Sequence, residues 1–389
     1  MLFRKIIALC TVFMLLPAMA IGELSGAPMV EGTPTDIECA SAILVEPQSG
    51  QIIFEQYADD MRPVASVTKL MTILLALEAV DSGRASMEDI VTVSKNASGM
   101  GGSQILLDTG EQQTYSQLLK SVIVCSANDS AVALAEYLYG SEELFVDYMN
   151  ERAEELGMTN TKYMNCTGLP AEGQYTTARD VARLSCEVFA HDAYYRFSTT
   201  WLEDFDHGDG RMTQMTNTNK LTRLYEGCDG GKTGSTDEAG YCFAATAKRG
   251  GMRLVAVVLG SSASTKRFDS AAAMFDYGFA NYRLYPVAEK GTPVKGELPV
   301  TGGSADGVRL VLDDDLTLLI TKGAEQNVEL APSLPESVEA PVAKGWQAGS
   351  VDVLLDGRKV ASLAVVTAES VEATGFKYLL QRIFGLWVI

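Results

Sequence analysis

The chain has 389 residues, a net charge of −19, an apolar fraction of 47% and a charged fraction of 21%. These values are typical of a globular protein, and the length exceeds what one hydrophobic core usually serves, so two domains are expected. A protein this acidic is repelled by phosphate backbones, and we therefore expect no nucleic acid partner.

Residues 1–20 have the pattern of a secretory signal. Arg4 and Lys5 precede an apolar run over residues 6–16, and a small-residue A-x-A pattern ends at Ala20. A membrane-spanning helix needs about 20 apolar residues, and this run is shorter. The pattern predicts export and cleavage of residues 1–20, which places the mature chain outside the cytoplasm.

Residues 34–281 are predicted to form one α/β domain, an antiparallel sheet with a helical lobe. Strand-like runs occur at both ends of this region and helical segments lie between them, which indicates one sheet whose terminal strands are adjacent. The expected strands are 41–45, 51–56, 229–235, 240–248 and 252–259. The expected helices are 66–80, 114–124, 127–139, 143–156, 177–190 and 265–281.

Residues 282–373 are predicted to form a small all-β domain, because short apolar or alternating runs alternate with Gly, Pro and Asp clusters. Three such runs are 308–312, 316–320 and 351–355.

Residues 374–389 have the pattern of an amphipathic helix that lies on a membrane surface. Lys377 and Arg382 lie off an apolar stripe that contains two aromatic types. The alternative is a terminal helix that docks on the β domain. The stripe is made of Phe376, Leu379, Leu380, Ile383, Phe384 and Trp387.

Six cysteines remain after the predicted cleavage, and they form neither a C-x-x-C pair nor a small disulfide-dense framework. Several lie in apolar runs, where a free thiol packs as a small hydrophobic group. We expect mostly free, buried cysteines, with one or two bridges as the alternative. The six are Cys39, Cys125, Cys166, Cys186, Cys228 and Cys242.

Histidine-based and metal-based chemistry have little support in the sequence. Only His191 and His207 are present, and neither has a recognisable partner motif, so both are expected to be surface or capping residues. No His/Cys cluster has the spacing of zinc ligands, and we expect neither a metal nor a cofactor. The pair of Gly231 and Lys232 looks like part of a phosphate-binding loop, but Glu226 stands where that loop needs glycine.

A serine and a lysine three residues apart, Ser66 and Lys69, offer another way to activate a nucleophile. At the start of a helix these positions share a face, so the Lys69 amine can reach the Ser66 hydroxyl. Lysine accepts a proton if burial or neighbouring cations lower its pKa. The helix N-terminus adds positive potential where an anion develops. This spacing also occurs by chance, so it is a weak signal alone.

Two further elements strengthen the signal: Ser126 and Asn128 at the start of a helix, and Lys232 and Gly234 on a strand that enters a turn. This ordered trio is that of penicillin-binding proteins and class A β-lactamases. The sequence resembles the penicillin-binding D-alanyl-D-alanine carboxypeptidases of low molecular mass, serine peptidases of family S11 that trim cell-wall stem peptides. The resemblance covers most of residues 35–281 and implies a penicillin-binding/β-lactamase-like fold. Its segments are 64–72, 126–135, 167–170, 229–234 and 237–241.

The resemblance implies catalytic roles. Ser66 would attack the carbonyl of the penultimate D-alanine of a peptidoglycan stem peptide and form an acyl-enzyme, with neutral Lys69 as the base. Ser126 would relay a proton to the leaving amine, helped by the Lys232 ammonium. Asn128 would orient Lys69 and hydrogen-bond the substrate amide.

The resemblance also implies substrate-binding roles around Gly234. The backbone N–H groups of Ser66 and Ser235 would form the oxyanion hole, while Thr233 and Arg267 would hold the terminal carboxylate. The chain departs from the family at Gln174, where a histidine is common between glycine and tyrosine. That departure concerns the local loop.

Three other functions remain as alternatives. A class A β-lactamase needs a glutamate that activates water, and residues 159–166 contain none, so β-lactam antibiotics should acylate Ser66 covalently and stay. A D,D-endopeptidase that cuts cross-links would use identical chemistry. A non-catalytic wall scaffold is disfavoured because Lys69 and Lys232 are costly to bury without a catalytic purpose.

Overall fold

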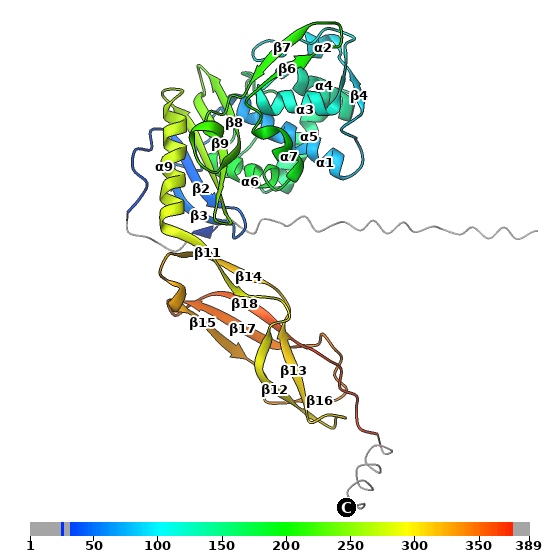
Figure 1. Ribbon diagram of the computed structural model, residues 1–389, viewed down its shortest axis with the longest axis vertical. Coiled ribbons are helices and arrows are strands. Elements are labelled where there is room, and N and C mark those ends of the chain that lie inside the picture. The colour runs from blue at the N-terminus through cyan, green and yellow to red at the C-terminus, as the bar shows by residue number, and fades with distance from the viewer. Residues whose placement is uncertain (1–24, 27–31, 376–389) are drawn as a thin grey trace, which may run out of the picture.

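The computed structural model describes residues 25–26 and 32–375, which form an α/β domain and an elongated β domain (Figure 1). The predicted signal segment lies outside the described residues, and so do residues 376–389 of the predicted amphipathic helix. Among the described helices, none is both long and apolar enough to cross a bilayer.

A six-stranded sheet organises the α/β domain, in the order β1-β3-β2-β10-β9-β8. β2 pairs antiparallel with β10, so the first and last long strands are neighbours, as the sequence predicted. Apart from the short parallel pair of β1 and β3, all pairings are antiparallel. The strands are β1 (Ser25–Gly26), β2 (Ser41–Glu46), β3 (Gln51–Gln56), β8 (Cys228–Thr236), β9 (Gly240–Arg249) and β10 (Met252–Ser261).

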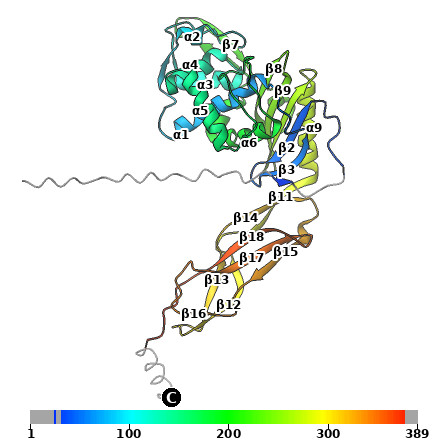
Figure 2. The same cartoon turned by 180° about the vertical axis from the view of Figure 1, so that it is seen from behind.

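Helices cover both faces of this sheet (Figures 1 and 2). Alternation along β10 explains why: Leu254 and Val258 face the core beneath α9, while Val255 and Val257 face the core of the helical lobe. α9 is Lys266–Asn281, and the lobe contains α1 (Lys69–Asp81), α3 (Tyr115–Val124), α4 (Asn128–Tyr139), α5 (Glu142–Glu155), α6 (Ala178–Val188) and α7 (Asp192–Ser198).

Several short elements complete the lobe, and they correct the sequence-based expectation. A helix was predicted from Ser66, but Ser66 lies in the 3-10 helix η1 (Ala65–Thr68), and α1 begins only at Lys69. The hairpin of β6 (Leu202–Asp206) and β7 (Met212–Thr216) was not predicted. The remaining short elements are α2 (Lys95–Ser98), α8 (Leu221–Leu224), β4 (Ile90–Thr92) and β5 (Gln112–Thr114).

The β domain has its own apolar core and begins without a linker, because β11 (Tyr282–Ala288) starts where α9 ends. β11 pairs with β14 (Leu316–Thr321), and a six-stranded sheet has the order β15-β17-β18-β13-β12-β16. Tyr282 and Leu319 pack into the core beneath α9 and so join the domains. The other elements are β12 (Pro293–Thr301), β13 (Gly307–Leu312), η2 (Glu325–Asn327), β15 (Val328–Ser333), β16 (Val338–Glu339), β17 (Gln347–Leu355) and β18 (Arg358–Thr367).

All six cysteines in the described part of the chain are free thiols, as expected. Cys39 and Cys125 are partly exposed, and the other four are buried.

Candidate active site

Ser66 lies on a tight turn that two glycine-containing segments hold from either side. A side chain at Gly234 on β8 would come within 2.8 Å of the Ser66 backbone nitrogen and 2.6 Å of the Val64 carbonyl oxygen. A side chain at Gly168 would collide with the carbonyl group of Ala65, whose φ is +49°. Only glycine permits this approach, so β8 and the loop around Gly168 are pressed against the backbone of Ser66.

Lys69 is fully buried one turn after Ser66, and its Nζ lies 2.9 Å from Ser66 Oγ. The same amine donates to the Thr167 carbonyl oxygen at 2.5 Å. Burial lowers the pKa of Lys69 to about 7, although electrostatic interactions with Cys166 and Asp129 oppose the shift. A substantial fraction of Lys69 is therefore neutral at neutral pH and can accept a proton from the serine.

The loop that carries Thr167 is built on two amide side chains. Asn165 Oδ1 accepts the backbone N–H groups of Thr167 at 3.2 Å and of Gly168 at 2.7 Å. Gln174, the residue that departs from the family pattern, donates to the Leu169 carbonyl oxygen at 3.3 Å and accepts the N–H of Asn165 at 3.3 Å. Gln174 therefore supports the loop that positions Lys69. Thr167 belongs to one of the segments that resemble the family, but the sequence did not indicate that its carbonyl oxygen holds the lysine.

A second serine–lysine pair faces the first. Lys232 on β8 donates from Nζ to Ser126 Oγ at 2.7 Å and to the Thr233 carbonyl oxygen at 3.0 Å. Burial lowers the pKa of Lys232 well below its ordinary value, and the positive charges of Lys69 and Arg267 lower it further. Ser126 has a φ of +65°, a conformation that non-glycine residues rarely adopt and that is often found at functional sites.

Asn128 lies at the first turn of α4, two residues after Ser126. Its Nδ2 donates to the Gly101 carbonyl oxygen at 2.6 Å, while its buried Oδ1 has no hydrogen-bond partner. The expected contact in which Asn128 orients Lys69 is therefore not formed, and the Thr167 carbonyl oxygen takes this place. An unpaired buried amide oxygen is costly, so Oδ1 gains a hydrogen bond if a ligand N–H group reaches it.

Arg267 approaches the same strand from the first turn of α9. Its Nη1 donates to the Gly234 carbonyl oxygen at 3.0 Å, and the guanidinium stacks over the rings of Phe268 and Tyr241. Thr233 is buried, while Ser235 is exposed at the end of the site. The predicted site residues on β8 and α9 thus lie together beside Ser66.

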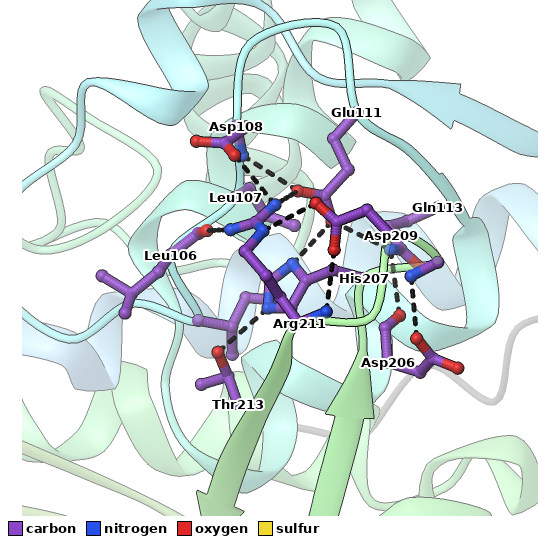
Figure 3. Close-up of polar contacts among 12 residues, drawn as sticks. Leu106, Leu107, Asp108, Glu111, Gln113, Asp206, His207, Asp209, Arg211 and Thr213 are labelled. Atoms are coloured by element: carbon purple, nitrogen blue, oxygen red, sulfur yellow. Dashed lines mark hydrogen bonds and ion pairs between the residues drawn. The ribbon is translucent and has the colours of Figure 1, made fainter.

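The histidines lie apart from these groups. His191 precedes α7 and pairs with Asp81 at 2.6 Å. His207 was expected on the surface or at a cap, but its side chain is completely buried and contacts Glu111 and Thr213 (Figure 3). Within the described residues, no group of three or more His, Cys, Asp and Glu side chains is placed to hold a metal ion.

Two serine–lysine pairs lie where a helical lobe meets the edge strand of an antiparallel sheet, and one lysine has a pKa lowered to about 7. This arrangement defines the class of penicillin-binding serine acyl-transfer proteins.

The sequence matches the family described as D-alanyl-D-alanine carboxypeptidase, peptidase S11, over residues 28–263. Residues 282–373 match the C-terminal domain of penicillin-binding protein 5. The chain therefore belongs to the S11 family of D-alanyl-D-alanine carboxypeptidases, which are serine peptidases.

Relatives and solved structures agree with this assignment. The D-alanyl-D-alanine carboxypeptidase DacF of Bacillus subtilis is 36% identical over 351 residues, which cover 90% of each chain. Penicillin-binding protein 5 of Haemophilus influenzae superposes with a TM-score of 0.77 at 30% identity, covering 88% of this chain and 99% of its own. Penicillin-binding protein D2 of Listeria monocytogenes, solved in an ampicillin-bound form, gives a TM-score of 0.56 at 31% identity and covers 62% and 97%.

Replacing Lys69 with methionine should remove a pH dependence of stability. The unfolded chain holds the Lys69 proton up to the ordinary pKa of 10.5, whereas the folded chain releases it near pH 7. Wild-type stability should therefore rise with pH across this interval, by up to about 1.4 kcal/mol per pH unit, relative to Lys69→Met. Urea unfolding at a series of pH values measures the difference.

The control for this experiment is Lys290→Met, at an exposed lysine of the β domain. Its stability should follow that of the wild type at every pH. Parallel stability curves for the wild type and Lys69→Met would contradict the lowered pKa of Lys69.

Proposed function

We propose that this chain is a serine-type carboxypeptidase that removes the terminal D-alanine from peptidoglycan stem peptides through an acyl-enzyme on Ser66. The observation that carries the proposal is the 2.9 Å hydrogen bond between Lys69 Nζ and Ser66 Oγ, with a lysine pKa of about 7. A neutral amine in contact with a serine hydroxyl is an activated nucleophile that needs neither histidine nor metal.

Acylation begins when Ser66 Oγ attacks the carbonyl carbon of the penultimate D-alanine and Lys69 takes the hydroxyl proton. The carbonyl oxygen becomes negative and is stabilised by the backbone N–H groups of Ser66 and Ser235. The close packing of Gly234 on the Ser66 nitrogen supports this role, because it places β8 beside the turn that carries the nucleophile. Donors fixed in advance for the oxyanion are commonly worth about 10²–10³ in rate.

The leaving group is the amine of the terminal D-alanine. Ser126 donates a proton to this nitrogen, helped by Lys232, which donates a 2.7 Å hydrogen bond to its oxygen, and Ser126 then recovers the proton that Lys69 took from Ser66. The unpaired Asn128 Oδ1 accepts the N–H of the substrate amide. The terminal carboxylate is attracted by Thr233 and by the positive charge of Arg267 behind β8. Water then hydrolyses the ester, with Lys69 as its base.

A β-lactam presents a reactive amide to the same serine and acylates it. The ampicillin-bound relative supports this reaction, and the absence of glutamate from residues 159–166 supports slow release of the product. We therefore propose β-lactams as covalent inhibitors and not as rapidly turned-over substrates.

The decisive experiment compares the wild type with Ser66→Ala. The purified protein, residues 21–389, is incubated with a fluorescent penicillin and, separately, with a peptide that ends in D-alanyl-D-alanine. Wild type should label stably and release D-alanine, whereas Ser66→Ala should lose both by at least about a thousandfold because it lacks the nucleophile. Ser82→Ala, at an exposed serine after α1, is the control and should behave as the wild type.

Each other outcome points to a different function. Labelling together with cleavage of cross-linked dimers, but without D-alanine release, would indicate a D,D-endopeptidase. Labelling without any peptide cleavage would indicate a scaffold, and rapid loss of the label would indicate a β-lactamase. A wild type that does not label would overturn the acyl-enzyme.

Acylation should depend on pH in a defined direction. Only the neutral form of Lys69 accepts the serine proton, so the second-order rate of penicillin labelling should rise with pH and level off above a midpoint near 7. Labelling reactions that are quenched at set times, at a series of pH values, measure how the rate depends on pH. Lys69→Arg should stay inactive throughout, because arginine does not release its proton in proteins. A rate that falls as pH rises through 7 would refute the role of Lys69.

We further propose that the protein acts outside the cytoplasm, peripherally bound to the outer face of the cytoplasmic membrane. The signal pattern of residues 1–20 and the amphipathic pattern of residues 374–389 support this location. The β domain lies between the catalytic domain and the C-terminal segment along the chain, which suits a role in holding the active site away from the membrane surface.

Truncation after residue 373 should release the protein from membranes. The full chain should lose residues 1–20 and sediment with the membrane fraction, whereas the truncated chain should be exported and remain in the supernatant, because it lacks the apolar stripe. Cell fractionation with penicillin labelling measures both. A truncated chain that still sediments, with a less stable β domain, would favour the docked-helix alternative.

A further inference from the structure

One loop, residues 101–111, forms the support of Asn128. The Gly101 carbonyl oxygen accepts Asn128 Nδ2 at 2.6 Å, and the Ser103 carbonyl oxygen accepts the Asn128 backbone N–H at 2.7 Å. The neighbouring buried carboxylate of Asp129 accepts the N–H groups of Ile105 and Leu107 at 3.1 and 3.2 Å. The direction of the Asn128 amide therefore depends on where this loop lies.

The far end of the loop is held by Glu111, whose side chain is only 6% exposed. Its carboxylate accepts hydrogen bonds from His207 Nδ1 at 2.8 Å, Gln113 Nε2 at 2.9 Å and the Asp108 backbone N–H at 3.0 Å, and it also pairs with Arg211 (Figure 3). A carboxylate surrounded by donors can be replaced by an amide only with loss, because the amide nitrogen donates and would face other donors.

Arg211 ties the middle of the loop to this end. Its Nη1 donates to the Leu106 carbonyl oxygen at 3.2 Å, while its Nη2 lies 2.9 Å from Glu111 Oε2 (Figure 3). Leu106 has a φ of +66° and the residue is 56% exposed, so no apolar packing of its own accounts for this strained conformation. Such a conformation persists only where surrounding contacts impose it. Here those contacts are Asp129 on one side and Arg211 on the other.

His207 connects Glu111 of the loop to the β6–β7 hairpin. Because ionised Glu111 only accepts hydrogen bonds, the His207 proton lies on Nδ1, and Nε2 contacts Thr213 Oγ1 at 2.9 Å. The hairpin thus presents His207 and Arg211 together to one carboxylate of the loop.

We infer that Glu111 and Arg211 are positioning residues of the reaction: they fix the 101–111 loop, whose Gly101 carbonyl group holds the Asn128 amide and leaves Oδ1 without a protein partner. This inference rests on the proposed function and extends it to two residues that touch neither the substrate nor the nucleophile. If the contacts of Glu111 are lost, the strained backbone at Leu106 relaxes and the loop shifts. Asn128 then loses the Gly101 carbonyl oxygen, the acceptor that sets the direction of its amide. A misplacement of about 1 Å in a reacting site can cost about 10²-fold in rate.

The test is a double-mutant cycle with Asn128. Glu111→Gln and Arg211→Ala are made in the wild type and in Asn128→Ala, and the second-order rate of labelling by fluorescent penicillin is measured well below every thermal midpoint. In the wild-type background each substitution should slow labelling by about tenfold or more. In the Asn128→Ala background each should change the rate by less than about twofold, because the group through which it acts is gone.

A purely structural role predicts a different pattern. Glu78→Gln, which breaks the ion pair of Glu78 with Arg152 at 2.8 Å, is the matched control and should lower the thermal midpoint without slowing labelling. Equal slowing by Glu111→Gln in both backgrounds, or no slowing in either, would overturn the inference. Arg211 is 40% exposed, so Arg211→Ala keeps the test valid if Glu111→Gln fails to fold. Normal labelling of the wild type in the same assay shows that the proposed function holds, so it separates failure of this inference from failure of that function.

Discussion

The site depends on one energetically unfavourable feature: the amine of Lys69 is buried next to Ser66. Removing a charged amine from water costs several kcal/mol, and the protein meets this cost by letting the amine lose its proton near pH 7. Burial also lowers the pKa of Lys232, and the nearby charge of Lys69 lowers it further, because two cations repel each other in a region of low dielectric. Burial of this lysine therefore lowers the stability of the folded protein but provides a base that works at neutral pH. Such a balance between stability and activity is common at active sites.

Such a base is useful only if the serine is held against it, and close backbone packing provides this. The turn at Ser66 is pressed between the loop at Gly168 and the strand at Gly234, two positions where a Cβ atom would collide with backbone. Gly168 and Gly234 lie 102 and 168 residues beyond Ser66, so distant segments of the chain meet at this turn without side chains between them. The Thr167 carbonyl oxygen then holds the lysine from the first of these segments, and the second carries Lys232.

The sequence predicted much of this arrangement because the signals are local. The long apolar strands β9 and β10 and the helix α9 have clear patterns, and the spacing of Ser66 and Lys69 places the two side chains together. Backbone partners are different: nothing in the residue types indicated that Thr167, and not Asn128, would contact the Lys69 amine. Such contacts depend on where loops meet in space.

The β6–β7 hairpin was missed for a related reason. Each of its strands buries only one large side chain, Phe205 and Met215. The other positions are polar except for the exposed Leu202 and Met212, so no period of two stands out. His207 itself was expected at the surface or at a cap. Burial of His207 comes from its partner Glu111, nearly a hundred residues away, and a pattern read along the chain does not contain that information.

The free thiols of this protein have a consequence for its chemical lifetime. Oxidation and disulfide exchange proceed through the thiolate, and burial raises the pKa of Cys39, Cys125, Cys228 and Cys242 to about 11. The thiols of Cys166 and Cys186 are shifted in the same direction by complete burial. At neutral pH hardly any of these sulfurs is ionised, so the fold itself makes them slow to react with oxidants.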